Sequence, residues 1–441
     1  MSQHGVYSGL CCLLLVLLVG CGGSPLMPAG APESPQASVG EATQTPTLSP
    51  SVDPAPERPL LMVHFMPWYE TPDVSGVWGW HWTMEHFDPR QVREDGMPDI
   101  ASHYVPLTGP YDSRDQAILE YQTLLMKLSG IDGVIVDWYG IEEFWDYGVI
   151  NRSTQALFAA VKKAGLRFAI CYEDQTVRHM VDNKHLAAGD VYTHGQQVMR
   201  YLQETWFDDE AYLQIEGRPA LFVFGPQYYK NPSDWDQLFS VLDTRPALIT
   251  LDRHTESAAV TSFPWPPMWA STQGVLSEEA LVGYLEGFYE KARRWDTLVA
   301  GAFPGFHDIY AEAGVGDSYG YLDAREGETF RLTLNMALDH DPDVIQLITW
   351  NDYGEGTIIE STAEFGTRYL EVVQETRRSF DGDAFLYTAD DLRLPLQLLE
   401  ARRRHTGDAG LQARLDEVFA TILSGAPDEA AAVLAELSPA P

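Results

Sequence analysis

Residues 344–360 read VIQLITWNDYGEGTIIE. The first six of them, Val344–Thr349, are apolar or β-branched apart from one glutamine and predict a buried strand. Two acids, Asp352 and Glu355, follow this strand within one turn of chain. Carboxylates beside a core strand cost free energy unless they are needed there. We interpret the pair as acid–base groups for an acetal, where one group protonates a leaving oxygen and another activates the nucleophile. A polar loop with helix-capping acids is the alternative.

From residue 59 onwards, apolar strands alternate with amphipathic helices. Eight strands separated by helices predict an α/β fold, a (β/α)8 TIM barrel. We expect the barrel over residues 59–382 and a small helical C-terminal extension over residues 383–441. The expected strands are Leu60–Met66, Gly133–Asp137, Arg167–Tyr172, Ala220–Phe224, Ala247–Leu251, Met268–Ser271, Leu298–Phe303 and Val344–Trp350. The expected helices are at about 112–129, 153–165, 190–206, 233–243, 277–294, 325–339 and 363–379.

Polar and aromatic residues recur at the carboxyl ends of these strands, which is where barrel enzymes carry their active sites. We expect the acids and histidines to hydrogen-bond a ligand and the aromatics to stack on sugar rings or line the site, with core packing as the alternative for several rings. The strand-end residues are Trp68, Tyr69, Glu70, Asp137, Trp138, Tyr139, Tyr172, Glu173, Asp174, Asp252, Arg253, His254, His307, Asp308, Trp350, Asn351 and Tyr353, together with the two acids.

The connection after the first strand, residues 70–111, is unusually long, and long loops in compact domains are usually functional. We expect it to form a wall of the cleft. It contains His81 and His103, which together with His307 raise the question of a metal. No spacing resembles a helix-borne ligand pair, so we expect no metal and no cofactor, and give these histidines structural or substrate-binding roles.

The N-terminal segments lie outside the predicted fold. Residues 1–20 contain an apolar run too short for a membrane span and predict a signal peptide. Residues 18–21, Leu-Val-Gly-Cys, resemble the lipobox of bacterial lipoproteins, which implies cleavage before Cys21 and lipidation of its thiol. An ordinary secretory signal or an uncleaved anchor are the alternatives. The proline-rich residues 21–58 predict a disordered linker. We therefore expect a lipid-anchored protein of the bacterial cell envelope.

The net charge and the number of cysteines restrict the classes of binding partner and of cross-link that we expect. The formal net charge of −35 does not suit binding to nucleic acid or to anionic lipid heads, whereas a neutral substrate is compatible with it. Of the four cysteines, only Cys171 lies within the predicted barrel, so no disulfide framework is expected. We interpret Cys171 as a small buried hydrophobic residue and expect a monomer.

Several of these motifs resemble those of known glycoside hydrolases. Residues 350–355, Trp-Asn-Asp-Tyr-Gly-Glu, resemble the signature of glycoside hydrolase family 71, the endo-α-1,3-glucanases. The longer frame to Glu360 is similar to the Trp-Asn-Glu-Trp-His-Glu-Gly-Thr-Gln-Ile-Glu motif of family 99, the endo-α-mannosidases and endo-α-mannanases. Residues 66–69, 130–138, 172–174 and 304–308 resemble further family 99 motifs in barrel order. Asp352 follows family 71 and Gly354 departs from family 99, so the sugar and the stereochemistry stay open.

The resemblance implies an endo-acting hydrolase of α-linked polysaccharide. Glu355 would be the general acid/base, and Asp352 the base acting on water or on a substrate hydroxyl. Asp137, Glu173 and Asp308 would hydrogen-bond sugar hydroxyls. A non-catalytic glycan-binding lipoprotein on the same barrel is the main alternative, but a binding module needs aromatics and not two convergent acids. A deacetylase or metal-dependent hydrolase would need an open His/Asp ligand set, which the sequence does not reveal.

Overall fold

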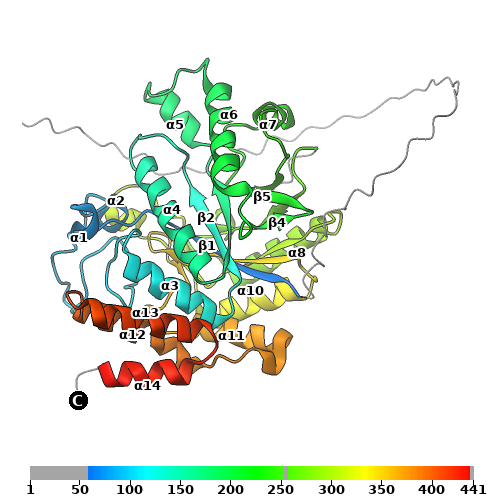
Figure 1. Ribbon diagram of the computed structural model, residues 1–441. Coiled ribbons are helices and arrows are strands. Elements are labelled where there is room, and N and C mark those ends of the chain that lie inside the picture. The colour runs from blue at the N-terminus through cyan, green and yellow to red at the C-terminus, as the bar shows by residue number, and fades with distance from the viewer. Residues whose placement is uncertain (1–57, 253–256, 438–441) are drawn as a thin grey trace, which may run out of the picture. The chain divides into compact units, whose positions relative to one another are not determined.

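The computed structural model describes residues 58–252 and 257–437. Eight parallel strands form a nearly closed (β/α)8 barrel, with helices outside it (Figure 1). In spatial order the strands run β7-β6-β5-β3-β2-β1-β11-β8. No ladder joins β7 to β8 among the described residues. The strands are β1 (Leu60–Phe65), β2 (Gly133–Trp138), β3 (Arg167–Tyr172), β5 (Arg218–Val223), β6 (Ala247–Leu251), β7 (Thr261–Phe263), β8 (Val299–Ala302) and β11 (Val344–Leu347).

The predicted sixth strand is wrong. Met268–Ala270 forms a 3-10 helix, η2, and the strand at this place in the barrel is β7, which contains only three residues. Pro264, Pro266 and Pro267 follow β7 and cannot donate to a ladder, so they end the strand early. The apolar residues beyond them do not enter the sheet, and Trp269 is 71% exposed.

The helices lie where the alternating pattern predicts them, with shifted ends. The α3 helix shows how the sequence sets such ends, because the Asp115 side chain accepts a hydrogen bond from the amide of Ala117 and Gly130 ends the helix at φ 85°. The main helices are α3 (Gln116–Ser129), α4 (Tyr147–Lys163), α6 (Val191–Leu202), α7 (Pro232–Phe239), α8 (Glu278–Ala292), α10 (Glu328–Leu338) and α11 (Arg368–Asp381).

The loops between these elements contain short helices and short strands. The short helices are α1 (Pro72–Ser75), α2 (Trp80–Thr83), α5 (Thr176–Asp182), α9 (Tyr310–Ala313), η1 (Gln203–Phe207), η3 (Arg325–Gly327), η4 (Gly382–Ala384) and η5 (Ala389–Arg393). The short strands are β4 (Gln214–Ile215), β9 (Phe306–His307), β10 (Tyr321–Leu322), β12 (Asn351–Asp352) and β13 (Thr357–Ile358).

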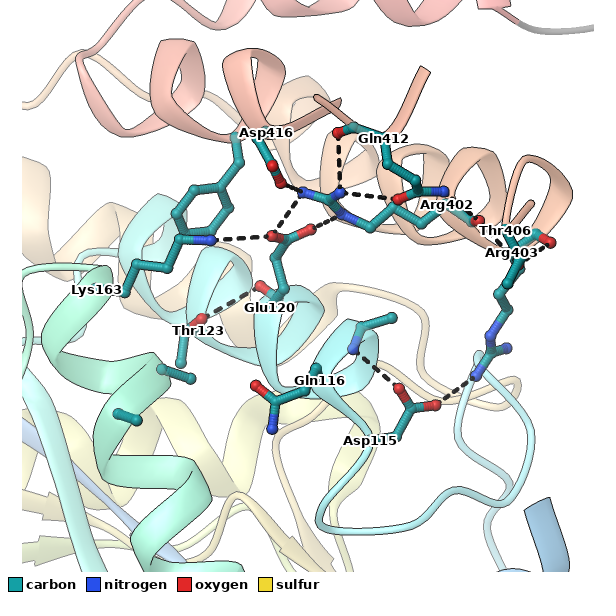
Figure 2. A pocket seen from close by; sticks show the side chains of 14 residues that line it. Asp115, Gln116, Glu120, Thr123, Lys163, Arg402, Arg403, Thr406, Gln412 and Asp416 are labelled. Carbon is teal, nitrogen blue, oxygen red and sulfur yellow. Dashed lines mark hydrogen bonds and ion pairs between the residues drawn. The ribbon is translucent and has the colours of Figure 1, made fainter. Parts of the chain in front are cut away.

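The C-terminal extension consists of α12 (Leu394–Arg404), α13 (Ala409–Leu423) and α14 (Pro427–Leu437), next to α3 in Figure 1. Arg402 of α12 joins it to the barrel through an ion pair with Glu120 of α3, and it forms a second ion pair at 2.8 Å with Asp416 of α13 inside the extension. A cavity of about 720 Å³ lies between the extension and the barrel helices. Figure 2 shows the side chains that line it. Its cations Lys163 and Arg403 are also paired, so the cavity offers no free charge to a ligand.

The predicted export and lipidation are not tested by the described part of the chain. No helix in residues 58–252 and 257–437 combines the length and the apolar character needed to cross a bilayer. The predicted signal peptide, Cys21 and all but the last residue of the predicted linker lie outside the described residues. The same is true of Arg253 and His254, two of the predicted strand-end residues.

Candidate active site

The chain beyond β11 folds into a tight hairpin that places the two predicted catalytic acids side by side. Strands β12 and β13 pair antiparallel, with Asp352 opposite Thr357. The amide of Glu355 donates to Oδ1 of Asp352 at 2.9 Å. Gly356 turns the chain at φ 67°, and a Cβ there would lie 2.5 Å from the carbonyl oxygen of His307, so only glycine fits. Asp352 is buried and Glu355 is partly exposed.

Two further acids from neighbouring strands complete a group of four, which we call the acid cluster: Asp137, Glu173, Asp352 and Glu355. Asp137 ends β2, and Glu173 follows β3 directly. Burial raises the pKa of Asp137 well above its usual range, and the charges of the other three acids raise it further. Burial also raises the pKa of Glu173 to about 7, against a hydrogen bond from Gln175. The four carboxyl groups therefore act on one another at one end of the barrel.

The two acids of the hairpin differ in how readily they ionise. Burial raises the pKa of Asp352 to about 6, while the amides of Glu355 and Gly354 and the charge of His81 oppose the rise. Burial, followed by the charges of Asp352 and Asp308, raises the pKa of Glu355 well above its usual range. The protonated form is therefore favoured more strongly at Glu355, and Asp352 is the carboxyl that loses its proton first. Environments that push two pKa values apart in this way assign one acid and one base.

The long loop after β1 contributes two histidines that stack on predicted site residues. The ring of His81 is parallel to that of Trp68, with centroids 4.3 Å apart, and its Nε2 lies 3.2 Å from Asp146. The ring of His103 stacks on that of His307 at 3.6 Å. This contact brings the loop beside the hairpin, because the amide of His307 donates to the carbonyl of Glu355 at 2.8 Å.

The hairpin is held by a buried network behind it. Asn351 joins it to the first strand, since its Oδ1 accepts from the amide of Met66 at 2.8 Å and its Nδ2 donates to the Met66 carbonyl. Glu360, at the end of the motif, accepts hydrogen bonds from the hydroxyls of Tyr111 and Tyr353 at 2.9 Å each and from Gln122 at 2.8 Å. Both carboxylate oxygens of Glu360 are thus paired, and this network fixes the backbone that presents the two acids.

Comparison with known proteins agrees with this architecture. A family model described as Glycosyl hydrolase family 99 matches residues 58–246, which contain β1, β2, β3 and β5. The Glycoprotein endo-alpha-1,2-mannosidase of Mus musculus is 21% identical over 373 residues, covering 75% of this chain and 77% of that protein. The chain is a family 71/99-like glycoside hydrolase.

Further relatives match a similar share of the chain. A Glycoprotein endo-alpha-1,2-mannosidase-like protein of Danio rerio is 22% identical over 325 residues, covering 68% of this chain and 70% of that protein. The GH99 endo-alpha-mannosidase structure from Bacteroides thetaiotaomicron aligns with a TM-score of 0.53 and 18% identity, over 76% of this chain and 98% of that chain. This structural likeness concerns the fold of the hydrolase, a TIM barrel.

Four aromatic residues of this glycoside hydrolase do not form the sugar platforms that the sequence predicts. Trp138, Tyr172, Trp350 and Tyr353 are all 0% exposed, so no face of their rings reaches a ligand. Trp138 packs parallel to Tyr201, and its Nε1 donates to Asn151 at 3.1 Å. Side chains alternate along a strand, so Trp138 points away from the face that carries Asp137. Their burial favours core packing, the alternative that the sequence leaves open for several of these rings.

Other predicted substrate contacts are occupied by the hydrolase itself. The carboxylate of Asp308 accepts hydrogen bonds from the amides of Tyr310 and Tyr319 and the hydroxyl of Ser318, so it orders a loop and is not available for a sugar hydroxyl. Asn351 is fully buried and Tyr69 is 1% exposed, so both residues support the hairpin from within the core. Trp68 at 9%, Glu173 at 7% and the partly exposed His307 keep some access to the site.

Two residues near the acids lie outside the predicted set of site residues. Trp265, in the loop after β7, hydrogen-bonds the Glu355 carboxyl through its side chain. Its ring also meets that of His64 edge-on, with centroids 4.9 Å apart. Glu360 is the other, and the motif that ends with it was the only signal for its importance. Trp265 has no such signal, because the loop that carries it follows a strand of three residues.

Proposed function

We propose that the protein is an exported, lipid-anchored glycoside hydrolase that cleaves α-mannosidic bonds inside a polysaccharide or oligosaccharide. One observation carries the catalytic part of this proposal: Asp352 and Glu355 lie side by side in a hydrogen-bonded hairpin, and their environments separate their pKa values. The names of the relatives, endo-alpha-1,2-mannosidase and endo-alpha-mannosidase, support α-mannosidic bonds and internal cleavage over α-glucan.

In this proposal Glu355 is the general acid that protonates the leaving oxygen, because its surroundings favour the protonated carboxyl and its side chain is partly exposed. The Asp352 carboxylate then removes a proton from the attacking water or from a neighbouring sugar hydroxyl. Glu173 hydrogen-bonds a hydroxyl of the bound sugar, and the edge of the Trp68 ring contacts the sugar. The chemistry uses only these side chains.

Two stereochemical courses are compatible with this pair of acids. An attacking water activated by Asp352 would invert the anomeric carbon in one displacement. A sugar hydroxyl activated by Asp352 would displace the leaving group from within the substrate, and a second displacement by water would then retain the configuration. The resemblance to family 99 favours the second course. The anomer released, followed by NMR as it forms, distinguishes the two.

The location is a separate part of the proposal. Residues 18–21 supply the lipidation motif, and the proline-rich composition of residues 21–58 predicts a linker long enough to hold the barrel away from the bilayer. We propose that the hydrolase acts as a monomer at the cell envelope, on glycans that reach its surface.

Digestion of a panel of α-mannans and α-glucans tests the function, with new reducing ends counted and products sized. We expect α-mannan to be cut early into oligosaccharides of several lengths, because an endo-acting enzyme attacks internal bonds. Release of monosaccharide alone would contradict endo action. Binding of the mannan without any new reducing ends would instead favour a glycan-binding protein.

A further inference from the structure

Three potential metal ligands meet inside the barrel on adjacent strands. They are His64 of β1, Asp137 of β2 and Cys171 of β3, and a ring nitrogen, a carboxylate oxygen and the sulfur lie within 4.8 Å of one another. Asp137 and Cys171 are direct partners in the β2–β3 ladder. His64 is opposite Ile135, two residues before Asp137, so all three side chains are on the same face of the sheet.

These ligands are buried but incompletely satisfied. His64 and Cys171 are 0% exposed and Asp137 is 3% exposed. Neither Nε2 of His64 nor Oδ1 of Asp137 has a hydrogen-bond partner. A buried polar atom without a partner costs about 1–3 kcal/mol, so two of them in one small space call for an explanation. A single atom bound between the three side chains would satisfy both.

Gln346 of β11 orients the histidine from behind. Its side-chain amide lies 2.7 Å from Nδ1 of His64, and its Oε1 has no partner. The two ends of a glutamine amide are assigned from the surrounding network. If the amide is turned over, Oε1 accepts the Nδ1 proton of His64, and the lone pair of Nε2 faces the other ligands. Metal-binding histidines are oriented in this way, by an acceptor on the second nitrogen.

The charge around this space favours a cation. In the part of the chain that the structure describes, no lysine or arginine forms an ion pair with any member of the acid cluster. Asp137 belongs to both groups, so a cation bound to it would lie next to the other three acids. Its positive charge would offset their mutual repulsion.

We infer that His64, Asp137 and Cys171 bind one divalent transition-metal ion of the zinc type. Zinc accepts nitrogen, oxygen and sulfur ligands together, whereas magnesium and calcium take oxygen ligands and disfavour thiolate. Bound as a thiolate and a carboxylate, Cys171 and Asp137 neutralise the two positive charges, and neutral His64 adds none. The thiol proton of Cys171 and the proton of the Asp137 carboxyl, where it is present, both leave to solvent when the ion binds. Three protein ligands leave the fourth tetrahedral position to a water molecule.

Metal analysis of the full-length protein tests this inference without any assay of hydrolysis. The protein is stripped of metal with a chelator, reloaded with Zn²⁺ or Co²⁺ and desalted. Its metal content is then measured by inductively coupled plasma mass spectrometry. We expect about one equivalent of metal per chain. Loading with Co²⁺ should also give the near-ultraviolet absorption of a thiolate–cobalt bond. Metal content near zero in the reloaded wild-type protein would overturn the inference.

Matched variants locate the ion. Cys171→Ser and Asp137→Asn preserve side-chain size, and each should lower the metal content at least tenfold under the same loading. The control is His194→Gln, which changes another buried histidine, paired with Glu142 at 3.3 Å, and should leave the metal content unchanged. Folding of each variant is checked by circular dichroism. If Cys171→Ser does not fold, the cobalt spectrum of the wild-type protein decides whether sulfur is a ligand. Full metal content in folded Cys171→Ser would refute the site.

Discussion

The backbone amide of Glu355 donates a hydrogen bond of 2.9 Å to Oδ1 of Asp352. This hydrogen bond affects the pKa values of the two acids in opposite directions. It stabilises the anionic form of Asp352, and the resulting negative charge raises the pKa of Glu355. One turn of the chain therefore supplies a base and an acid together, as the proposed hydrolysis requires.

Replacement of Glu355 by Gln should remove the proton donor while preserving its shape. General acid–base groups contribute about 10²–10⁴-fold in rate, and we expect a loss of that order in kcat/KM on α-mannan. The loss should be much smaller on a mannoside whose leaving group departs without protonation. Steady-state kinetics on both substrates checks this. Near wild-type turnover of α-mannan by the variant would show that Glu355 is not the acid.

Activity should depend on pH through the same two acids. The base works when ionised, so kcat/KM should rise with pH through about 6, the pKa of Asp352. It should fall at higher pH, where Glu355 loses its proton. Asp352→Asn should abolish the rise and impair natural and activated substrates alike, because the nucleophile needs activation in both cases. A rise at the same pH in active Asp352→Asn would assign that titration to another group.

The buried carboxyl of Glu360 should make stability fall as pH rises. Burial raises its pKa to about 7 in the folded protein from 4.5, so the folded state binds more protons than the unfolded state between these values. The free energy of unfolding therefore decreases with pH across this window, by about 3 kcal/mol from this group. Glu360→Gln should remove that part of the decrease, measured by urea unfolding at pH 4.5 and pH 7.5. The exposed substitution Glu417→Gln should leave the pH dependence unchanged.

Trp138 should behave as a core residue. Trp138→Ala removes a fully buried ring that packs on Tyr201, and we expect it to lower the free energy of unfolding by about 3–5 kcal/mol. Trp269→Ala is the control, because that ring is 71% exposed and its loss should change stability by less than about 0.5 kcal/mol. Chemical denaturation of the two variants makes the comparison. If both variants unfold with the same free energy, Trp138 does not contribute to the core.

The lipid anchor has its own test. Cys21→Ser removes the thiol that the predicted lipidation needs, so the protein should lose fatty-acid labelling and move from the membrane fraction to the soluble fraction. Fractionation and metabolic labelling of wild-type and variant proteins measure this. A wild-type protein that carries no fatty acid would contradict the lipoprotein prediction.

Local pattern predicts most of the barrel because each apolar strand of ordinary length is a strong signal. Seven of the expected strands coincide with strands of the structure, and Val344–Leu347 lies where residues 344–350 predict it. The exception is β7, whose three residues are too few to give an apolar pattern. The prolines after it, rather than its own residues, mark where it ends.

The barrel, the two acids after its last strand and the resemblance to families 71 and 99 could all be predicted from the amino-acid sequence. These follow from residues that are neighbours in the chain. The burial of Trp138, Trp350 and Tyr353 could be seen only in the folded barrel, because a ring at a strand end faces either the ligand or the helices and composition does not say which. Only the barrel also brings His64, Asp137 and Cys171 together. Their strands are far apart in sequence, and parallel pairing makes them neighbours.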